Sequence, residues 1–186
     1  MRPSHYFNVE VRGSRGIGFG SACVLGMTRL IGFLHPFFKT VPDTYAIDLP
    51  AMRSRREQRH LGHVVRVFAS SRDAADTLAS HLESNPRIAD LAMLGRTRTI
   101  DVETFDGPWV TLRRFRVASR SQPNNRMRDL DAAQVLPFVR TRSHTNDHAY
   151  TLTLLRKGWS EQPVFGTPNS YGLSGETPVC LPDLPA

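Results

Sequence analysis

The sequence predicts an α+β fold in two parts, and three observations lead to this expectation. Stretches in which apolar and polar residues alternate are typical of strands, and two longer stretches between them are typical of helices. Together they give the order β-α-β-β-α-β over roughly the first hundred residues. Past Trp109 the composition shifts to an arginine-rich segment and two further strand-like stretches. We therefore expect one domain over residues 1–108 and a C-terminal region over residues 109–186.

The first strand and the first helix are separated by glycines. Apolar residues alternate with polar ones over residues 5–12, which predicts a strand with one buried face. Residues 13–21 follow as a loop, because their G-x-G-x-G spacing does not match the G-x-G-x-x-G pattern of dinucleotide sites. Residues 22–35 are mostly apolar and predict a helix. We expect it to end at His35, because Pro36 disfavours helical geometry at the residue before it.

Three more strands and a second helix complete the first domain. Residues 44–50 and 63–69 are rich in residues that favour strands. Residues 71–84 predict a helix that begins at a capping serine, Ser71. Residues 88–100 combine strand-forming residues with a glycine break. This is the order of the ferredoxin-like fold, which RNA-recognition domains share with many unrelated proteins.

The C-terminal region is expected to contain a β-hairpin. Residues 136–143 and 149–158 both read as strands, and the polar stretch between them reads as a turn. Further along, the segment 169–175, NSYGLSG, places one tyrosine among small residues. Taken alone, this tyrosine is most simply a packed ring on a surface turn.

The charge of the chain points to nucleic acid. The net charge is +7, and arginine accounts for nearly all of the positive charge because only two lysines are present. The planar guanidinium binds phosphate in two places, although a genome rich in G and C would also favour arginine codons. The segment after Trp109 carries six arginines with no acidic residue between the first and the last of them: Arg113, Arg114, Arg116, Arg120, Arg126 and Arg128. Such a run is either a solvated face or a phosphate-binding surface.

Metal and redox chemistry are not expected. Cys23 and Cys180 fit neither a metal-binding spacing nor a disulfide framework. His144 and His148 are four residues apart, but they lie between strands, without the carboxylates or cysteines of a metal site around them. There is no signal peptide and no apolar run long enough to cross a membrane, so we expect a cytoplasmic protein without a membrane partner.

His35 is the first candidate for acid–base chemistry. Cleavage of RNA by its own 2'-OH needs one group that takes a proton, groups that hold the ribose and phosphate in line, and cations near the phosphate. At the end of an apolar helix the His35 ring can face a cleft, and a helix C-terminus favours the protonated ring. A capping or packing histidine fits the same position. The same residue types would also suit a plain RNA-binding module.

Five stretches, taken in chain order, make the sequence similar to a known family. They are SHYFNVEVR near the N-terminus, LIGFLH with the following AIDLP, FRVASRSQP, LPFVRTRSHT with the later LTLLRKG, and SYGLS near the C-terminus. They span nearly the whole chain. On these residues the chain resembles the pre-crRNA processing endoribonucleases of type I-F CRISPR systems.

The resemblance implies a ferredoxin-like domain followed by a region that grips an RNA hairpin. It implies a cut in CRISPR repeat RNA 3' of the hairpin stem, with no metal or other cofactor, that leaves a 2',3'-cyclic phosphate and a 5'-OH. It also implies that the protein keeps the crRNA and joins the backbone protein subunits of the crRNA-guided surveillance complex. The alternatives are a catalytically inactive relative that holds an RNA hairpin and a generic RNA-binding protein.

The resemblance also implies roles for particular residues. His35 falls on the general base, Ser143 on the serine that positions the ribose and its 2'-OH, and Thr145 on a second hydroxyl position. Tyr171 falls on a tyrosine that orients the histidine. The presence of His35, Ser143 and Tyr171 together argues against an inactive copy. The residues expected to bind RNA are Arg113, Arg114, Arg116, Arg120, Arg126, Arg128, Arg140, Arg142 and His144, among which Arg116 falls on an arginine that reads the base of the stem.

The chain departs from the family pattern in three ways. Ala118 stands where the family has a glutamine, and His144 stands in a serine-glutamine-serine motif, where it is a candidate to replace the lost contact. The family's long arginine-rich helix must here fit between Pro123 and Pro137, which we expect to allow about two and a half turns. Recognition of the stem must therefore be shorter or use further arginines. The candidates are Arg53, Arg55, Arg56 and Arg59.

Overall fold

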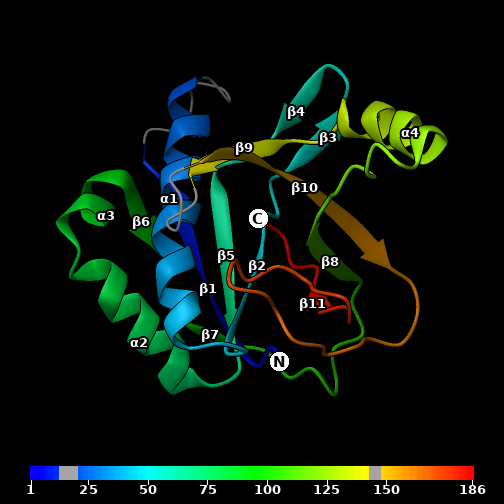
Figure 1. Cartoon of the computed structure of the whole chain (residues 1–186). Coiled ribbons are helices and arrows are strands. Elements are labelled where there is room, and N and C mark those ends of the chain that lie inside the picture. Colours follow the sequence, from blue (N-terminus) through cyan, green and yellow to red (C-terminus); the bar gives the residue numbers. More distant parts are fainter. Residues whose placement is uncertain (13–20, 143–147) are drawn as a thin grey trace.

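The computed structural model describes residues 1–12, 21–142 and 148–186 (Figure 1). Its first part is an antiparallel sheet with the strand order β2-β5-β1-β6, in which β7 also pairs with β1. The strands are β1 (His5–Val11), β2 (Tyr45–Asp48), β5 (Val64–Ala69), β6 (Ala92–Leu94) and β7 (Arg98–Thr99). The helices of this part are α1 (Ser21–Thr40), α2 (Arg72–Glu83) and α3 (Pro86–Leu91). β5 lies between β1 and β2 and is antiparallel to both, which is the ferredoxin-like order, so the predicted α+β fold is confirmed.

The central strand β5 is buried on both faces. Val65 and Val67 of β5 pack into the core with α1 and α2, whereas Phe68 belongs to a second cluster with Val110 and Leu181 of the C-terminal region. Figure 1 shows the same arrangement, with the helices on one side of the sheet and the C-terminal strands on the other. This explains why β5 is apolar at nearly every position rather than at alternate ones.

The C-terminal region forms a second antiparallel sheet with the strand order β11-β8-β10-β9. Its strands are β8 (Trp109–Arg114), β9 (Phe138–Arg142), β10 (Ala149–Trp159) and β11 (Leu181–Pro182). β9 pairs along its length with the first half of β10, with Tyr150 opposite Thr141, which confirms the predicted hairpin. Leu112, Leu152 and Leu154 share one core cluster with the first sheet. The boundary between residues 108 and 109 stays a prediction.

A buried ion-pair network ties the two parts together. The Arg156 guanidinium on β10 donates two hydrogen bonds to the fully buried carboxylate of Asp48 on β2, at 2.7 and 3.0 Å. It also contacts a carboxylate oxygen of Asp183 at 2.6 Å. These bonds raise the pKa of Arg156 against the effect of burial, so the guanidinium stays charged. Removing one partner would leave an uncompensated buried charge.

The predicted end of α1 at His35 is wrong, because the helix continues through Pro36 to Thr40. An internal proline costs roughly 3 kcal/mol, since it removes one hydrogen bond of the helix. Two buried or half-buried rings in the following turn offset this cost. Phe38 is 3% exposed and stacks on Tyr45, and Phe37 packs against Tyr45 and His81. The helix-end argument for a protonated His35 is therefore also wrong.

Two elements stand out from the two sheets in Figure 1. A small hairpin is formed by β3 (Arg53–Arg55) and β4 (Gln58–His60), and it was not predicted from the sequence. The short helix α4 (Pro123–Ala133) has eleven residues, about three turns, which is slightly longer than expected. It buries none of its residues, and Met127 is 63% exposed.

Candidate functional site

The rings of His35 and Tyr171 lie face to face. Their centroids are 3.8 Å apart and their planes differ by 2°. His35 is half-buried on α1, and Tyr171 is half-buried in the turn that follows Asn169. The structure thus brings together two of the four predicted catalytic residues, although 135 residues lie between them in the chain.

A backbone carbonyl of the same turn fixes the protonation pattern of the histidine. The Nδ1 atom of His35 lies 2.7 Å from the carbonyl oxygen of Ser170. A carbonyl only accepts hydrogen bonds, so Nδ1 must carry the proton and donate it. In the neutral ring, the lone pair that can accept a proton is therefore on Nε2. This is the arrangement that a general base requires.

The turn that holds His35 is built by an asparagine and a glycine. The Asn169 side-chain oxygen accepts hydrogen bonds from the backbone N–H groups of Tyr171, at 2.8 Å, and Leu173, at 3.3 Å. Gly172 has φ +71°, and its carbonyl accepts a hydrogen bond of 2.9 Å from Ile47 on β2. A Cβ at Gly172 would lie 2.8 Å from a ring carbon of Phe38. Only glycine fits both this conformation and this contact.

Tyr171 is held from its other end by a second tyrosine. Its hydroxyl hydrogen-bonds the hydroxyl of Tyr150 on β10, and the Arg114 guanidinium lies 5.7 Å from the centre of the Tyr150 ring. Burial, followed by the contact with Tyr150, raises the pKa of Tyr171, while Thr141 and the charge of Arg114 act in the opposite direction. The net result is a phenol that stays neutral well beyond its ordinary range. A continuous line of contacts therefore runs from Arg114 to His35.

The other predicted catalytic residues lie outside the described part of the chain. Ser143 and Thr145 fall between β9 and β10, in residues 143–147, and so does the predicted RNA-binding residue His144. The side chain of Arg142 is also outside the description. The described ends of this segment lie close to the site, because Tyr150 both pairs with Thr141 and contacts Tyr171.

Most of the predicted RNA-binding arginines are exposed. Six of them present their side chains to solvent: Arg113, Arg114, Arg116, Arg120, Arg128 and Arg140. Arg126 is half-buried instead, and it donates a hydrogen bond of 3.0 Å to the carbonyl of Ala118. The backbone N–H of Ala118 also donates a hydrogen bond to the Asp129 carboxylate, so Arg126 and Asp129 hold α4 against the preceding loop. Arg126 therefore has a structural contact in addition to any role with RNA.

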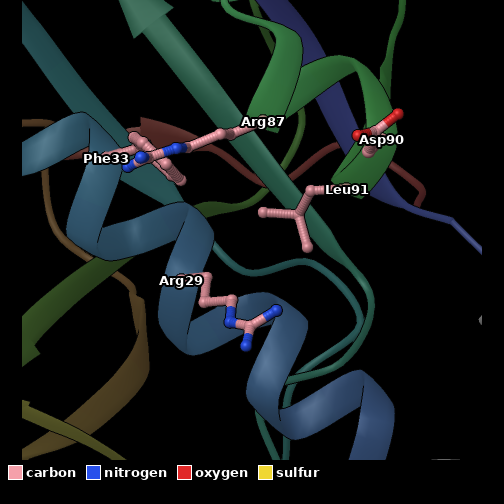
Figure 2. Close-up of a pocket in the computed structure, with 5 residues that line it drawn as sticks. All are labelled: Arg29, Phe33, Arg87, Asp90 and Leu91. Carbon is pink, nitrogen blue, oxygen red and sulfur yellow. The ribbon is translucent and has the colours of Figure 1, made fainter.

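A cavity of about 460 Å³ lies away from this site (Figure 2). Arg29 and Phe33 of α1 line it together with residues of α3, among them Arg87. His35 is two residues after Phe33, or about 200° around the helix, so its ring leaves α1 on nearly the opposite side. The cavity is therefore separate from the His35 and Tyr171 pair.

Neither a metal centre nor a membrane span is found among the described residues. In residues 1–12, 21–142 and 148–186, no three His, Cys, Asp or Glu side chains gather in a way that could hold a metal ion. Within the same ranges, no helix has the length and apolar character needed to cross a bilayer.

Sequence reasoning missed several residues that build the site. Tyr150 and Thr141 contact Tyr171 only because β9 pairs with β10, and no local sequence pattern predicts these contacts. Ser170 acts through its backbone carbonyl, which any residue would supply. Asn169 and Gly172 could have been found, since an asparagine followed by a glycine three residues later is typical of a tight turn.

Comparison with known families gives one match that covers nearly the whole chain. The family model Cas_Csy4, described as CRISPR-associated protein (Cas_Csy4), matches residues 6–183. This range includes both sheets and all the residues that surround His35 and Tyr171. A search of curated proteins found no match to the chain.

Proposed function

The chain belongs to the Cas_Csy4 family of CRISPR-associated endoribonucleases, which process CRISPR repeat RNA, and we propose that it cuts the repeat 3' of its hairpin by metal-independent attack of a 2'-OH. The observation that carries the proposal is the orientation of His35. Its Nδ1 proton is engaged by the Ser170 carbonyl and its ring is stacked on Tyr171, so Nε2 is the basic atom of the neutral ring.

In the proposed reaction His35 is the general base. Nε2 takes the proton from the 2'-OH of the nucleotide upstream of the cut. The 2' oxygen forms a bond to the adjacent phosphorus as the bond from phosphorus to the 5' oxygen breaks. The leaving 5' oxygen takes up a proton from solvent water and the protonated His35 ring then returns its proton to solvent, which gives one product with a 2',3'-cyclic phosphate and one with a 5'-OH. Alignment of the 2'-OH, the phosphorus and the leaving oxygen contributes much of the rate enhancement.

Four further residues position or bind the reacting groups in this proposal. Ser143 and Thr145 bind the ribose and its 2'-OH through their hydroxyls, as the family resemblance implies. Tyr171 keeps the His35 ring in place by stacking, and its neutral phenol avoids placing a negative charge against the imidazole. Arg114 is exposed and its guanidinium lies 5.7 Å from the ring of Tyr150, which bonds Tyr171, so it is suited to a phosphate near the cut.

Recognition and retention of the RNA form the second part of the proposal. The exposed arginines contact the phosphates of the hairpin, Arg116 reads the base of the stem, and His144 replaces the lost contact by stacking on or hydrogen-bonding a base. The protein then keeps the crRNA and joins the backbone subunits of the surveillance complex in the cytoplasm. A first domain over residues 1–108 would supply His35, and a region over residues 109–186 would supply Ser143 and Tyr171.

A cleavage gel tests the catalytic part directly. Purified protein is incubated with hairpin-containing repeat RNA from its own locus in excess EDTA. One parallel reaction uses RNA with a 2'-deoxy nucleotide just upstream of the cut, and another uses the His35→Ala protein. We expect a single cut at the base of the stem in the first reaction and none in the other two.

Each contrary result points to a different error. Cleavage that needs an added divalent cation would contradict the metal-independent step. Cleavage of the 2'-deoxy RNA would contradict attack by the 2'-OH. Tight binding of wild-type protein to the hairpin with no cut would favour the alternative of an inactive protein that holds RNA.

A further inference from the structure

Two arginines from separate elements meet at one aromatic ring beside the β3–β4 hairpin. The guanidinium carbons of Arg59, on β4, and Arg140, on β9, each lie 5.8 Å from the centre of the Phe138 ring. The two carbons are therefore no more than about 12 Å apart. Both arginines are exposed and Phe138 is half-buried. We name Arg59, Phe138 and Arg140 the Phe138 cluster.

The hairpin is held in this position by a specific bond. One guanidinium nitrogen of Arg59 donates a hydrogen bond of 2.8 Å to the carbonyl of Gln134, the residue that caps the C-terminal end of α4. Figure 1 shows the hairpin beside α4 and the start of β9. Arginine has five N–H donors, so Arg59 can keep this bond and still bind an anion. The geometry of the cluster is thus set before any ligand arrives.

The charge at the cluster is not balanced by nearby acids. Within the described residues neither Arg59 nor Arg140 forms an ion pair with a carboxylate. Residues 53–60 hold four arginines and one glutamate, a net charge of +3. Burial and the nearby Arg53 and His63 lower the pKa of His60, so His60 adds little positive charge near neutral pH. Two unbalanced arginines at one ring are suited to a phosphate, which accepts hydrogen bonds from planar guanidinium groups.

The Phe138 cluster lies on the face of β9 opposite the proposed cleavage site. Neighbouring side chains alternate along a strand, so Phe138 and Arg140 share one face of β9, whereas Thr141, which contacts Tyr171, lies on the other. In the described residues β9 is an edge strand of its sheet, so a ligand can reach both of its faces from that edge. Phe138 is three residues before Thr141, which is about 10 Å along a strand at roughly 3.3 Å per residue, and a nucleic-acid strand passes a few phosphates over this distance. An RNA stem whose base is at His35 can therefore pass the edge of β9 to reach the Phe138 cluster.

We propose that the Phe138 cluster is a second phosphate-binding site for the RNA stem, and that the β3–β4 hairpin supplies part of the grip that the short helix α4 lacks. This inference rests on the proposed function, since it takes the same RNA hairpin as the ligand. It assigns Arg59 and Arg140 to one site, where they bind the same phosphate or two consecutive phosphates of one strand.

The hairpin itself provides a matched control. Ser54 pairs with Arg59, whereas Arg53 pairs with His60 and Arg55 pairs with Gln58. Cross-strand partners share a face and neighbours along a strand alternate, so Arg53 and Arg55 lie on the face opposite Arg59. The double variant Arg59→Gln/Arg140→Gln and the double variant Arg53→Gln/Arg55→Gln remove the same charge from the same region. They differ in whether the Phe138 cluster is lost. Of the candidates Arg53, Arg55, Arg56 and Arg59, the proposal assigns Arg59 to the RNA stem and excludes Arg53 and Arg55 from it, because they lie on the other face of the hairpin.

Binding of a non-cleavable repeat hairpin, with a 2'-deoxy nucleotide upstream of the cut, is measured against salt concentration. We expect Arg59→Gln/Arg140→Gln to weaken binding about 10- to 100-fold at physiological salt and to lower the slope of log Kd against log salt by about two. Arg53→Gln/Arg55→Gln should change Kd less than about threefold. A neutral methylphosphonate at the contacted stem position should weaken binding of the wild type, but should add nothing to the Arg59→Gln/Arg140→Gln variant.

Three outcomes would contradict the inference. Unchanged binding by Arg59→Gln/Arg140→Gln, with a thermal midpoint like that of the wild type, would exclude the cluster as a phosphate site. Equal losses in both double variants would show a general effect of charge. Failure of the wild type to bind any repeat hairpin would overturn the proposed function and this inference with it. If the wild type cleaves the repeat and the Arg59→Gln/Arg140→Gln variant binds it normally, only this inference is overturned.

Discussion

The surroundings of His35 and the arginine surface are built in opposite ways. His35, Tyr171 and Gly172 are fixed by stacking, backbone hydrogen bonds and a conformation that only glycine adopts easily. Arg113 and Arg114 of β8, Arg140 of β9 and the arginines of the β3–β4 hairpin are exposed. Geometry therefore matters most at the first region, and the number and position of charges matter most at the second.

This difference separates two kinds of measurement. Changes around His35 should reduce the rate of cleavage and leave affinity nearly constant, because they disturb the alignment of reacting groups. Substitution of the arginines should reduce affinity and its dependence on salt, because a protein with fewer phosphate contacts releases fewer counterions from the RNA when it binds. If the two regions have these separate roles, substitutions in the first should change the rate and substitutions in the second should change the affinity.

The largest effect is expected from His35→Ala. Loss of the general base should lower the single-turnover rate of cleavage by about 10² to 10⁴-fold. The Kd for a non-cleavable hairpin should change less than about threefold, since the imidazole contributes no phosphate contact in the proposed reaction. A loss of binding as large as the loss of rate would show that the division between the two regions is false.

The contrast also explains what could be predicted from the sequence. β1, β2, β5, β9 and β10 could be predicted because their apolar residues alternate or cluster, and the β9–β10 hairpin follows from two such stretches around a polar turn. β8 and β11 of the second sheet were not predicted as strands, since β8 opens the arginine-rich segment and β11 has only two residues. The β3–β4 hairpin has no apolar residue in either strand, so periodicity gives no signal for it. The end of α1 could not be read from Pro36, because the packing of Phe37 and Phe38 decides it.

The residues of the candidate site also differ in whether the sequence could predict them. His35 and Tyr171 could be named from short motifs, and the structure brings them into contact. Tyr150 could not, because its contact with Tyr171 depends on strand register and on the path of a distant turn. Ser143 and Thr145 remain predictions, since they lie outside the described residues.

Gly172→Ala should give the next largest effect. The added Cβ would meet the Phe38 ring at 2.8 Å, and a non-glycine residue at φ +71° costs about 1–3 kcal/mol. The turn must shift, and a displacement of about 1 Å at Ser170 and Tyr171 can cost on the order of 10² in rate. Cleavage rate and thermal unfolding measure the two effects.

Gly158→Ala is the matched control for that substitution, because a Cβ at Gly158 would meet no atom within 4 Å. It should leave the rate unchanged. If Gly172→Ala cleaves at the wild-type rate, the turn does not need its observed conformation and the stacking of Tyr171 on His35 is not what positions the base.

Arg114→Gln tests the point where the two regions meet. Its guanidinium is exposed but contacts the Tyr150 ring, so it should contribute a phosphate contact and also support the tyrosine pair. We expect affinity to fall about tenfold and the salt slope to fall by about one. The rate at saturating protein should fall only a few-fold.

Arg98→Gln, at an exposed position on β7, is the control for the loss of one charge. It should have little effect on either quantity. Equal salt slopes for wild type and Arg114→Gln would remove Arg114 from the phosphate-binding surface.

The smallest effect is expected from Tyr150→Phe, which removes one hydroxyl from the line that ends at His35. A hydrogen bond of this kind contributes about 0.5–1.5 kcal/mol, so the rate should fall about two- to tenfold while binding stays constant. Ionisation of Tyr171 gives a sharper test. The Tyr150 hydroxyl is one cause of the raised pKa of Tyr171, so its removal lowers that pKa and Tyr171 ionises at lower pH than in the wild type. Ultraviolet absorbance follows this ionisation when the signal of the matching Tyr171→Phe variant is subtracted. The Tyr171 signal should appear at lower pH in Tyr150→Phe than in the wild type, and superimposable titrations would mean that the Tyr150 hydroxyl does not act on the phenol of Tyr171.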